Sequence, residues 1–143
     1  MKIEIIPYLT FSGNCREAMR FYQSCLGGDL HFQTIGDSRG TNKKTPQKIK
    51  DCILHASLVQ EAIILMGTDL VSDAGLLQGN SVSLVLNCNS EGEIRKLYKQ
   101  LSTGGVAKYP LANTLAGAIF GSCKDKYGHH WLLNYNKQYQ GEQ

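Results

Sequence analysis

Hydrophobic and polar residues alternate along positions 3–11, which is the period of a β-strand. Tyr8 and Thr10 share one side of this strand, and Leu9 lies on the other. Pro7 removes a backbone donor from it, which favours a place at a sheet edge or at a seam between sheets.

A helical period follows this strand. Apolar residues recur at spacings of three and four, after Asn14 as the expected N-cap and before Gly27 and Gly28 as the stop. Residues 30–35, 52–59 and 62–66 then predict three strands, and the last two form a hairpin. This half of the chain is therefore strand, helix and three strands.

The second half repeats that order. Residues 81–88 alternate as a strand, and Ser90 with Glu93 begins a second helix as a capping box. Three more strands are expected at residues 106–110, 117–123 and 130–135. The same kinds of residue recur about 76 positions apart: Asn14, Phe21-Tyr22 and Gly28, then Ser90, Leu97-Tyr98 and Gly104.

A repeated unit of one helix and four strands can cover only one face of its sheet. The sequence therefore predicts an α+β fold, a single domain with pseudo-repeats at residues 1–70 and 79–137. In this fold two tandem βαβββ units form a curved mixed sheet around a central cavity, with the helices outside. Concave faces of this kind bind small molecules.

Composition narrows the function classes. The chain has 143 residues, a net charge of +3 and an ordinary share of apolar residues. The densest basic stretch, Lys43 to Lys50, lies in a polar loop at about residues 37–50 without aromatic support, so we expect no nucleic-acid partner. We interpret this loop either as a lid or as a solvated segment.

Cysteine usage and hydropathy bear on location. Five cysteines are an odd number without CxxC spacing or a secretory leader, which predicts reduced thiols in the cytoplasm. The apolar runs are too short to span a bilayer, so no membrane partner is expected. Exposed strand edges favour a homodimer.

Several segments resemble the PhnB-like branch of the glyoxalase, or vicinal oxygen chelate, superfamily. They are Pro7–Cys15 with Ala18 and Phe21-Tyr22, Ile53–Ala56, Met66–Asp69, and Asp125–Trp131. The superfamily includes lyases, isomerases, dioxygenases, bleomycin-resistance-type proteins and simple binders, so the resemblance implies the fold without fixing the reaction. The branch also carries a methyltransferase name, but the sequence has no glycine-rich loop followed by an acidic residue to bind the methyl donor.

The resemblance implies four metal-ligand positions, which fall at Pro7 or Tyr8, at His55, near Ser81 and near Leu132. His55 is the one ordinary ligand among them, and a single imidazole does not retain a divalent ion. We therefore predict no cofactor, with a divalent metal at His55 as the alternative.

His55 is the predicted catalytic residue. It lies mid-strand with Ser57 on its own side, and a histidine can act as a general acid or base near neutral pH. A hydrogen-bonded interior histidine is the competing interpretation. The other predicted ligand-binding residues are polar or near the cavity mouth: Tyr8, Thr10, Ser57, Ser81, Ser83, His130, Leu132 and Asn134.

Three functions remain open from the sequence. The first is a protein that binds a small, partly polar organic molecule, with or without turnover through His55. The second is a metal-dependent lyase or dioxygenase with ligands rearranged among His55, His130 and a carboxylate. The third is a non-catalytic sequestering or interaction protein. We interpret Glu61, Asp69 and Asp73 as solvated carboxylates, and Trp131 as a core residue facing a helix.

Overall fold

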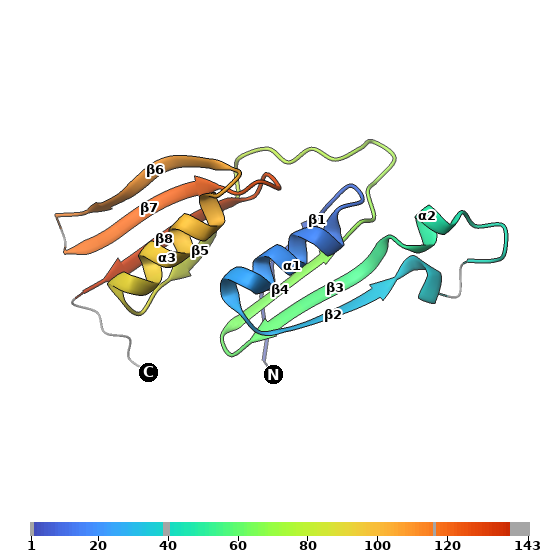
Figure 1. The fold of residues 1–143 in the computed structure, drawn as a ribbon, viewed down its shortest axis with the longest axis horizontal. Coiled ribbons are helices and arrows are strands. Elements are labelled where there is room, and N and C mark those ends of the chain that lie inside the picture. The colour runs from blue at the N-terminus through green and yellow to red at the C-terminus, as the bar shows by residue number, and fades with distance from the viewer. Residues whose placement is uncertain (1, 39–40, 116, 138–143) are drawn as a thin grey trace. The chain divides into compact units, whose positions relative to one another are not determined.

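The computed structural model describes residues 2–38, 41–115 and 117–137, and the chain divides into two compact units, Met1–Leu77 and Gln78–Gln143 (Figure 1). Each unit has the predicted order of strand, helix and three strands. One pseudo-repeat lies in each unit, and the α+β class is confirmed.

Unit 1 contains a four-stranded sheet in the order β1-β4-β3-β2. β1 pairs in parallel with β4, and the other pairs are antiparallel. β1 is an edge strand, as Pro7 predicted. The elements are β1 (Tyr8–Thr10), α1 (Cys15–Leu26), β2 (Asp29–Thr34), the short 3₁₀ helix η1 (Ile35–Asp37), α2 (Gln47–Lys50), β3 (Ile53–Gln60) and β4 (Ile63–Thr68).

Unit 2 repeats this topology in the order β5-β8-β7-β6, again with a parallel pair, β5 with β8. Its elements are β5 (Leu84–Asn87), α3 (Glu91–Ser102), β6 (Val106–Asn113), β7 (Ala118–Lys124) and β8 (His130–Asn136). The strands of the two units belong to two separate hydrogen-bonded sheets.

Each of the two long helices, α1 and α3, packs on one face of its own sheet. In unit 1, Met19 and Tyr22 of α1 and Leu58 of β3 are fully buried. Gly67 of β4 permits this close packing, because a Cβ there would come within 3.3 Å of Met19 Sδ and 3.1 Å of the Phe11 ring. We call the opposite face of this sheet, which carries Tyr8 and His55, the distal face of unit 1.

The core of unit 2 follows the same rule. Ile94 and Leu101 of α3 are fully buried, as are Leu133 and, to within 2%, Trp131 of β8. The interpretation of Trp131 as a core residue on the helix side is therefore confirmed. The distal face of unit 2 carries the alternate residues of β8, which include Leu132 and Asn134.

Two predicted strands are longer than the observed ones. Alternation runs over residues 3–11 and 81–88, yet β1 and β5 cover three and four residues. A strand needs a partner as well as a pattern. In the β5–β8 register Leu84 pairs with Trp131, so Ser81 would fall opposite Gly128, which closes the turn that begins at Asp125.

The two helices begin differently. Ser90 Oγ accepts the Glu93 N–H at 3.1 Å, as predicted, and Glu93 Oε1 accepts the Asn89 N–H at 2.7 Å. Asn14 is the N-cap residue of α1, as predicted, but its side chain makes no cap hydrogen bond. Instead Asp69 Oδ1 accepts the N–H groups of Gly13 and Cys15, each at 2.9 Å.

Candidate functional site

Tyr8 and His55 meet on the distal face of unit 1. The Tyr8 hydroxyl lies 3.3 Å from His55 Nδ1, and the ring centroids are 5.8 Å apart. Tyr8 is 51% exposed and His55 is half-buried, so both rings are accessible from solvent. The structure thus joins two of the predicted site residues by a side-chain hydrogen bond.

Sheet register explains why these residues share a face. Tyr8 pairs with Met66, and Met66 pairs with Ser57, so the three form one row across β1, β4 and β3. His55 lies two residues before Ser57 and therefore on the same side of β3. Thr10 lies two residues after Tyr8 and pairs with Thr68. The four predicted residues of this unit are consequently neighbours on one surface.

The predicted site residues of unit 2 do not form one group of neighbours on a single surface. Asn134 Nδ2 donates to Asn87 Oδ1 at 3.4 Å, and Leu132 pairs with Val85. His130 Nε2 lies 3.3 Å from the carbonyl oxygen of Gly79. Ser81 and Ser83 are exposed residues that precede β5, so they do not form the polar face of a strand.

The distal face of unit 2 carries different side chains from the distal face of unit 1 at the corresponding positions. The row Val85–Leu132–Ser122 corresponds to Tyr8–Met66–Ser57. The register is the same because the Cys88 N–H donates to the Asn134 carbonyl just as the Phe11 N–H donates to the Thr68 carbonyl. Phe120, two residues before Ser122, is therefore the counterpart of His55. Asn87 is likewise the counterpart of Thr10. The imidazole of the first repeat is replaced by a phenyl ring in the second.

Sequence reasoning missed Asn87, Phe120 and Ser122. The helices repeat at 76 residues, but the paired part of the first strand repeats at 77, since Tyr8 corresponds to Val85. A shift of one residue moves every side chain to the other face. The signal lay in the shorter connection between β5 and α3, which has one residue fewer than that between β1 and α1.

Other titratable groups have structural roles. Asp69 was interpreted as a solvated carboxylate, and that was wrong: besides its bonds to the α1 N-terminus, its Oδ2 accepts the Ile53 N–H at 2.8 Å. Burial raises the pKa of the Cys15 thiol to about 12, and the charge of Asp69 adds to this rise. Burial also raises the pKa of Cys88 and of Cys123 to about 11 each. These thiols are poor nucleophiles near neutral pH.

The residues at the family's ligand positions do not fit a divalent metal. Within residues 2–38, 41–115 and 117–137, no group of three or more histidine, cysteine, aspartate or glutamate side chains is placed to hold an ion. The expected positions supply one imidazole, His55, beside Tyr8, Ser81 and Leu132. We therefore derive no chemical step through a metal.

Comparison with known proteins assigns the family. The fold and the arrangement of the repeats define a glyoxalase-like α+β protein. Residues 3–134 match the family model described as 3-demethylubiquinone-9 3-methyltransferase, and the chain belongs to this family. It is 30% identical to Protein YjdN of Escherichia coli (strain K12) over 92% of this chain and 95% of that protein.

Solved structures agree with this assignment. Protein PA1353 from Pseudomonas aeruginosa is 36% identical, with a TM-score of 0.81 over 94% of this chain and 98% of that one. A Bacillus cereus protein described as a putative 3-demethylubiquinone-9 3-methyltransferase, PhnB protein, is 24% identical, with a TM-score of 0.70 over 93% and 99%. The PhnB-like resemblance is confirmed.

The fold is also that of the wider superfamily. A glyoxalase/bleomycin resistance protein from Albidiferax ferrireducens T118 superposes with a TM-score of 0.62 at 14% identity, over 94% of this chain and all of that one. At this identity the likeness concerns the fold. No helix in the described ranges is both long and apolar enough to cross a bilayer.

The family's name includes methyltransferase, but the chain has no loop typical of methyl-donor binding after its first strand, where one is expected. The turn between β1 and α1 contains one glycine, Gly13, whose N–H donates to Asp69. A glycine-rich loop followed by an acidic residue would be needed there to bind the methyl donor. We therefore derive no methyl-transfer step.

Proposed function

We propose that the chain binds a small, partly polar organic molecule on the distal face of unit 1, with His55 and Tyr8 as its main contacts. The observation that carries this proposal is the hydrogen bond between Tyr8 Oη and His55 Nδ1 on an accessible surface. The bond orients the imidazole and occupies Nδ1, so Nε2 is the ring nitrogen available to a ligand.

The direction of that hydrogen bond sets the chemistry of Nε2. When the Tyr8 hydroxyl donates to Nδ1, a neutral His55 carries its proton on Nε2 and donates to a ligand oxygen. When Nδ1 carries the proton, Nε2 accepts one from the ligand and is a general base. Both arrangements suit a ligand with an oxygen function, and Met66 and the methyl group of Thr10 supply apolar contacts beside it.

Binding is tested by NMR titration of the ¹⁵N-labelled protein with small molecules that combine hydroxyl or carbonyl oxygens with an apolar group. We expect at least one of them to shift the amides around Tyr8, His55 and Ser57, and the shift to weaken in His55→Ala. Lys99→Ala, on the exposed side of α3, is the control. Shifts that persist unchanged in His55→Ala would refute the proposal.

We also propose that the standard metal site has been lost. Elemental analysis of the purified protein beside His55→Ala tests this. Stoichiometric metal in the wild type that disappears from the variant would refute it and favour a metal-dependent lyase or dioxygenase. Metal below a tenth of the protein concentration in both would support metal-free binding.

We further propose a cytoplasmic homodimer. β2 and β6 are edge strands, and exposed edges favour pairing between copies. Native mass spectrometry tests the oligomeric state, and a monomer at micromolar concentration would exclude the dimer. Fractionation of the producing cells tests the location.

A further inference from the structure

A hollow lies on the helix side of the unit 1 sheet, away from the face that carries His55. It has a volume of about 560 Å³ and is walled by the first turns of α1, by α2, and by the segments that lead into β3 and out of β4. This volume falls within the range of small-molecule sites. All of its walls belong to unit 1.

Two arginines on α1 dominate this hollow. Arg16 and Arg20 are one turn apart, and both guanidinium groups lie over the ring of Phe32, at 5.2 Å and 5.7 Å from its centroid. Phe32 pairs with Ala56 and so points toward α1. A guanidinium held over an aromatic ring loses rotational freedom while N–H groups stay available for hydrogen bonds.

The arginines are further positioned by the chain opposite. Arg16 Nη2 donates to the carbonyl oxygen of Asp51 at 3.3 Å, which links α1 to the end of α2. Lys48 of α2 adds a third cation to the wall. Cations from two helices thus line one space, together with the three carboxylates Glu17, Asp51 and Asp69.

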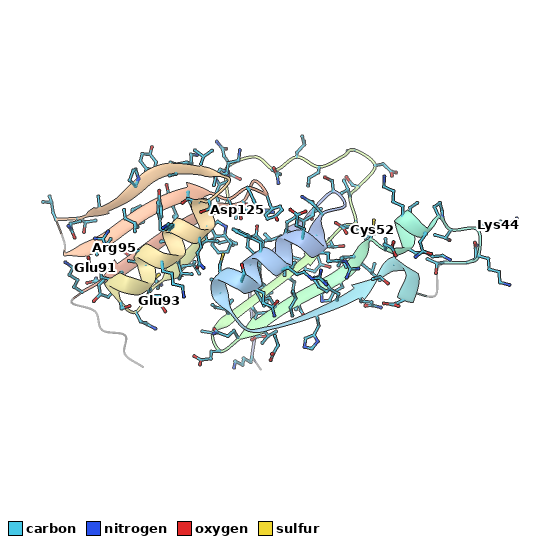
Figure 2. All side chains as sticks on the ribbon, in the orientation of Figure 1. Lys44, Cys52, Glu91, Glu93, Arg95 and Asp125 are labelled. Carbon is cyan, nitrogen blue, oxygen red and sulfur yellow. The ribbon has the colours of Figure 1, made fainter. Side chains whose placement is uncertain are left out.

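The acidic groups of the wall are largely committed to other partners. Both oxygens of Asp69 accept backbone N–H groups, and Asp51 Oδ1 accepts Gln47 Nε2 at 2.8 Å. Glu17 is the third carboxylate. The wall also contains three cations, Arg16, Arg20 and Lys48. Lys43, Lys44 and Lys50 lie close to Lys48 in the sequence and add further positive charge to this part of the chain. Figure 2 shows Lys44 and Cys52 at this end of unit 1.

We propose that this hollow binds a small organic anion with at least two negative charges, of the phosphate or polycarboxylate kind. Paired arginines recognise the oxygens of either group through two parallel hydrogen bonds. The site is separate from the proposed His55 site and does not depend on it. We refer to it as the Arg16–Arg20 site.

Inorganic pyrophosphate and citrate are the probes. Each is titrated into the ¹⁵N-labelled full chain at low ionic strength. We expect saturable shifts at residues 13–20 and 48–52, with weakening at higher salt because the contacts are ionic. Response to pyrophosphate alone identifies a phosphate site, and response to citrate alone identifies a carboxylate site; both outcomes support the proposal.

Variants make the test decisive. The double variant Arg16→Gln/Arg20→Gln is expected to raise Kd tenfold or more, a loss of at least about 1.4 kcal/mol, because both guanidinium groups that would contact the anion are removed. Lys48→Gln, at an exposed position on a short helix, covers the case in which the double variant does not fold, and a threefold or greater rise in Kd is expected, on the order of 1 kcal/mol. Arg95→Gln, in the exposed ion pair with Glu91, is the matched control.

Any of the following results would overturn the Arg16–Arg20 site: no saturable shift with either probe, shifts spread over other basic surfaces, or binding that the Arg16, Arg20 and Lys48 variants leave unchanged. The proposal would also be overturned if a single-stranded oligonucleotide bound through Lys43 and Lys44 more tightly than pyrophosphate or citrate binds. His55→Ala should leave anion binding intact, so failure here and failure of the proposed His55 site are distinguishable.

Discussion

The carboxylate of Asp125 accepts a hydrogen bond from the indole Nε1 of Trp131 at 2.8 Å. Its other oxygen accepts the backbone N–H groups of Tyr127 and His129 at 2.8 Å and 3.1 Å. Asp125 is 2% exposed and lies at the start of the turn before β8 (Figure 2). One buried carboxylate therefore fixes both the turn and the largest aromatic side chain of unit 2.

Replacing Asp125 by Asn should lower the free energy of unfolding by about 3 kcal/mol, because the charge is lost and an NH₂ group faces donors. Chemical denaturation measures the change. Trp131→Phe removes the indole donor, and the double variant should lose less than the sum of the two single changes. Full additivity would show that the two side chains do not stabilise each other.

Asp69→Asn should lower the free energy of unfolding by about 2 kcal/mol. As with Asp125, the charge is lost and an NH₂ group faces backbone donors, but Asp69 is only partly buried, so the expected change is smaller. The exposed Asp73→Asn is the matched control and should change stability by less than about 0.5 kcal/mol. Hydrogen exchange should quicken at Gly13, Cys15 and Ile53, whose N–H groups Asp69 accepts. Equal stability of the two variants would contradict the structural role.

His129 should make the protein less stable in mild acid. Burial lowers its pKa, the charge of Asp125 opposes that effect, and His130 adds to the lowering. In the unfolded chain a histidine titrates near about 6.5. As the pH falls through that value, the unfolded chain binds a proton that the folded chain does not, so the free energy of unfolding decreases.

Denaturant titrations between about pH 7 and pH 5 measure this dependence. The wild type should lose more stability over that range than His129→Gln, which cannot titrate. Parallel curves for the two proteins would mean that His129 has the same proton affinity folded and unfolded.

The five cysteine thiols, none of which is in a disulfide, should divide into two reactivity classes. Cys15, Cys88 and Cys123 are buried with raised pKa values, whereas Cys25 and Cys52 are partly exposed. We expect a disulfide reagent to modify Cys25 and Cys52 first at neutral pH and the other three on unfolding. Mass spectrometry of the modified peptides identifies them. Early modification of Cys15 would contradict its packing against Gly67.

Periodicity predicted both helices and the order of strands because those signals are local. The stripe of α1 buries Ala18, Met19 and Tyr22, and the Ser90 cap forms within four residues of chain. Asp69 could not be assigned in this way, since its partners Gly13 and Cys15 lie more than fifty residues earlier. No local pattern encodes that contact.

The candidate site was predictable where strand parity sufficed and not where register mattered. Parity within each strand was enough to group Tyr8 with Thr10 and His55 with Ser57. The register of β1 and β3 against β4 then places the two pairs on one face. Phe120 and Asn87 required the pairing of β5 with β8 and of β7 with β8. Ser81 and Ser83 do not lie on a strand face for the same reason: the alternation begins before Leu84, the first paired residue of β5.

The parallel pairs β1–β4 and β5–β8 have a consequence for synthesis on the ribosome. In each sheet the first strand pairs with the last strand to be synthesised. Tyr8 therefore cannot pair until Met66 has been made, and Leu84 cannot pair until Trp131 has been made. Chains emerge from the N-terminus and domains fold as units. The first sheet can therefore close while much of the second is still being translated. The second closes only after β8 has been made, so a ribosome that stalls before Trp131 would leave β5 unpaired.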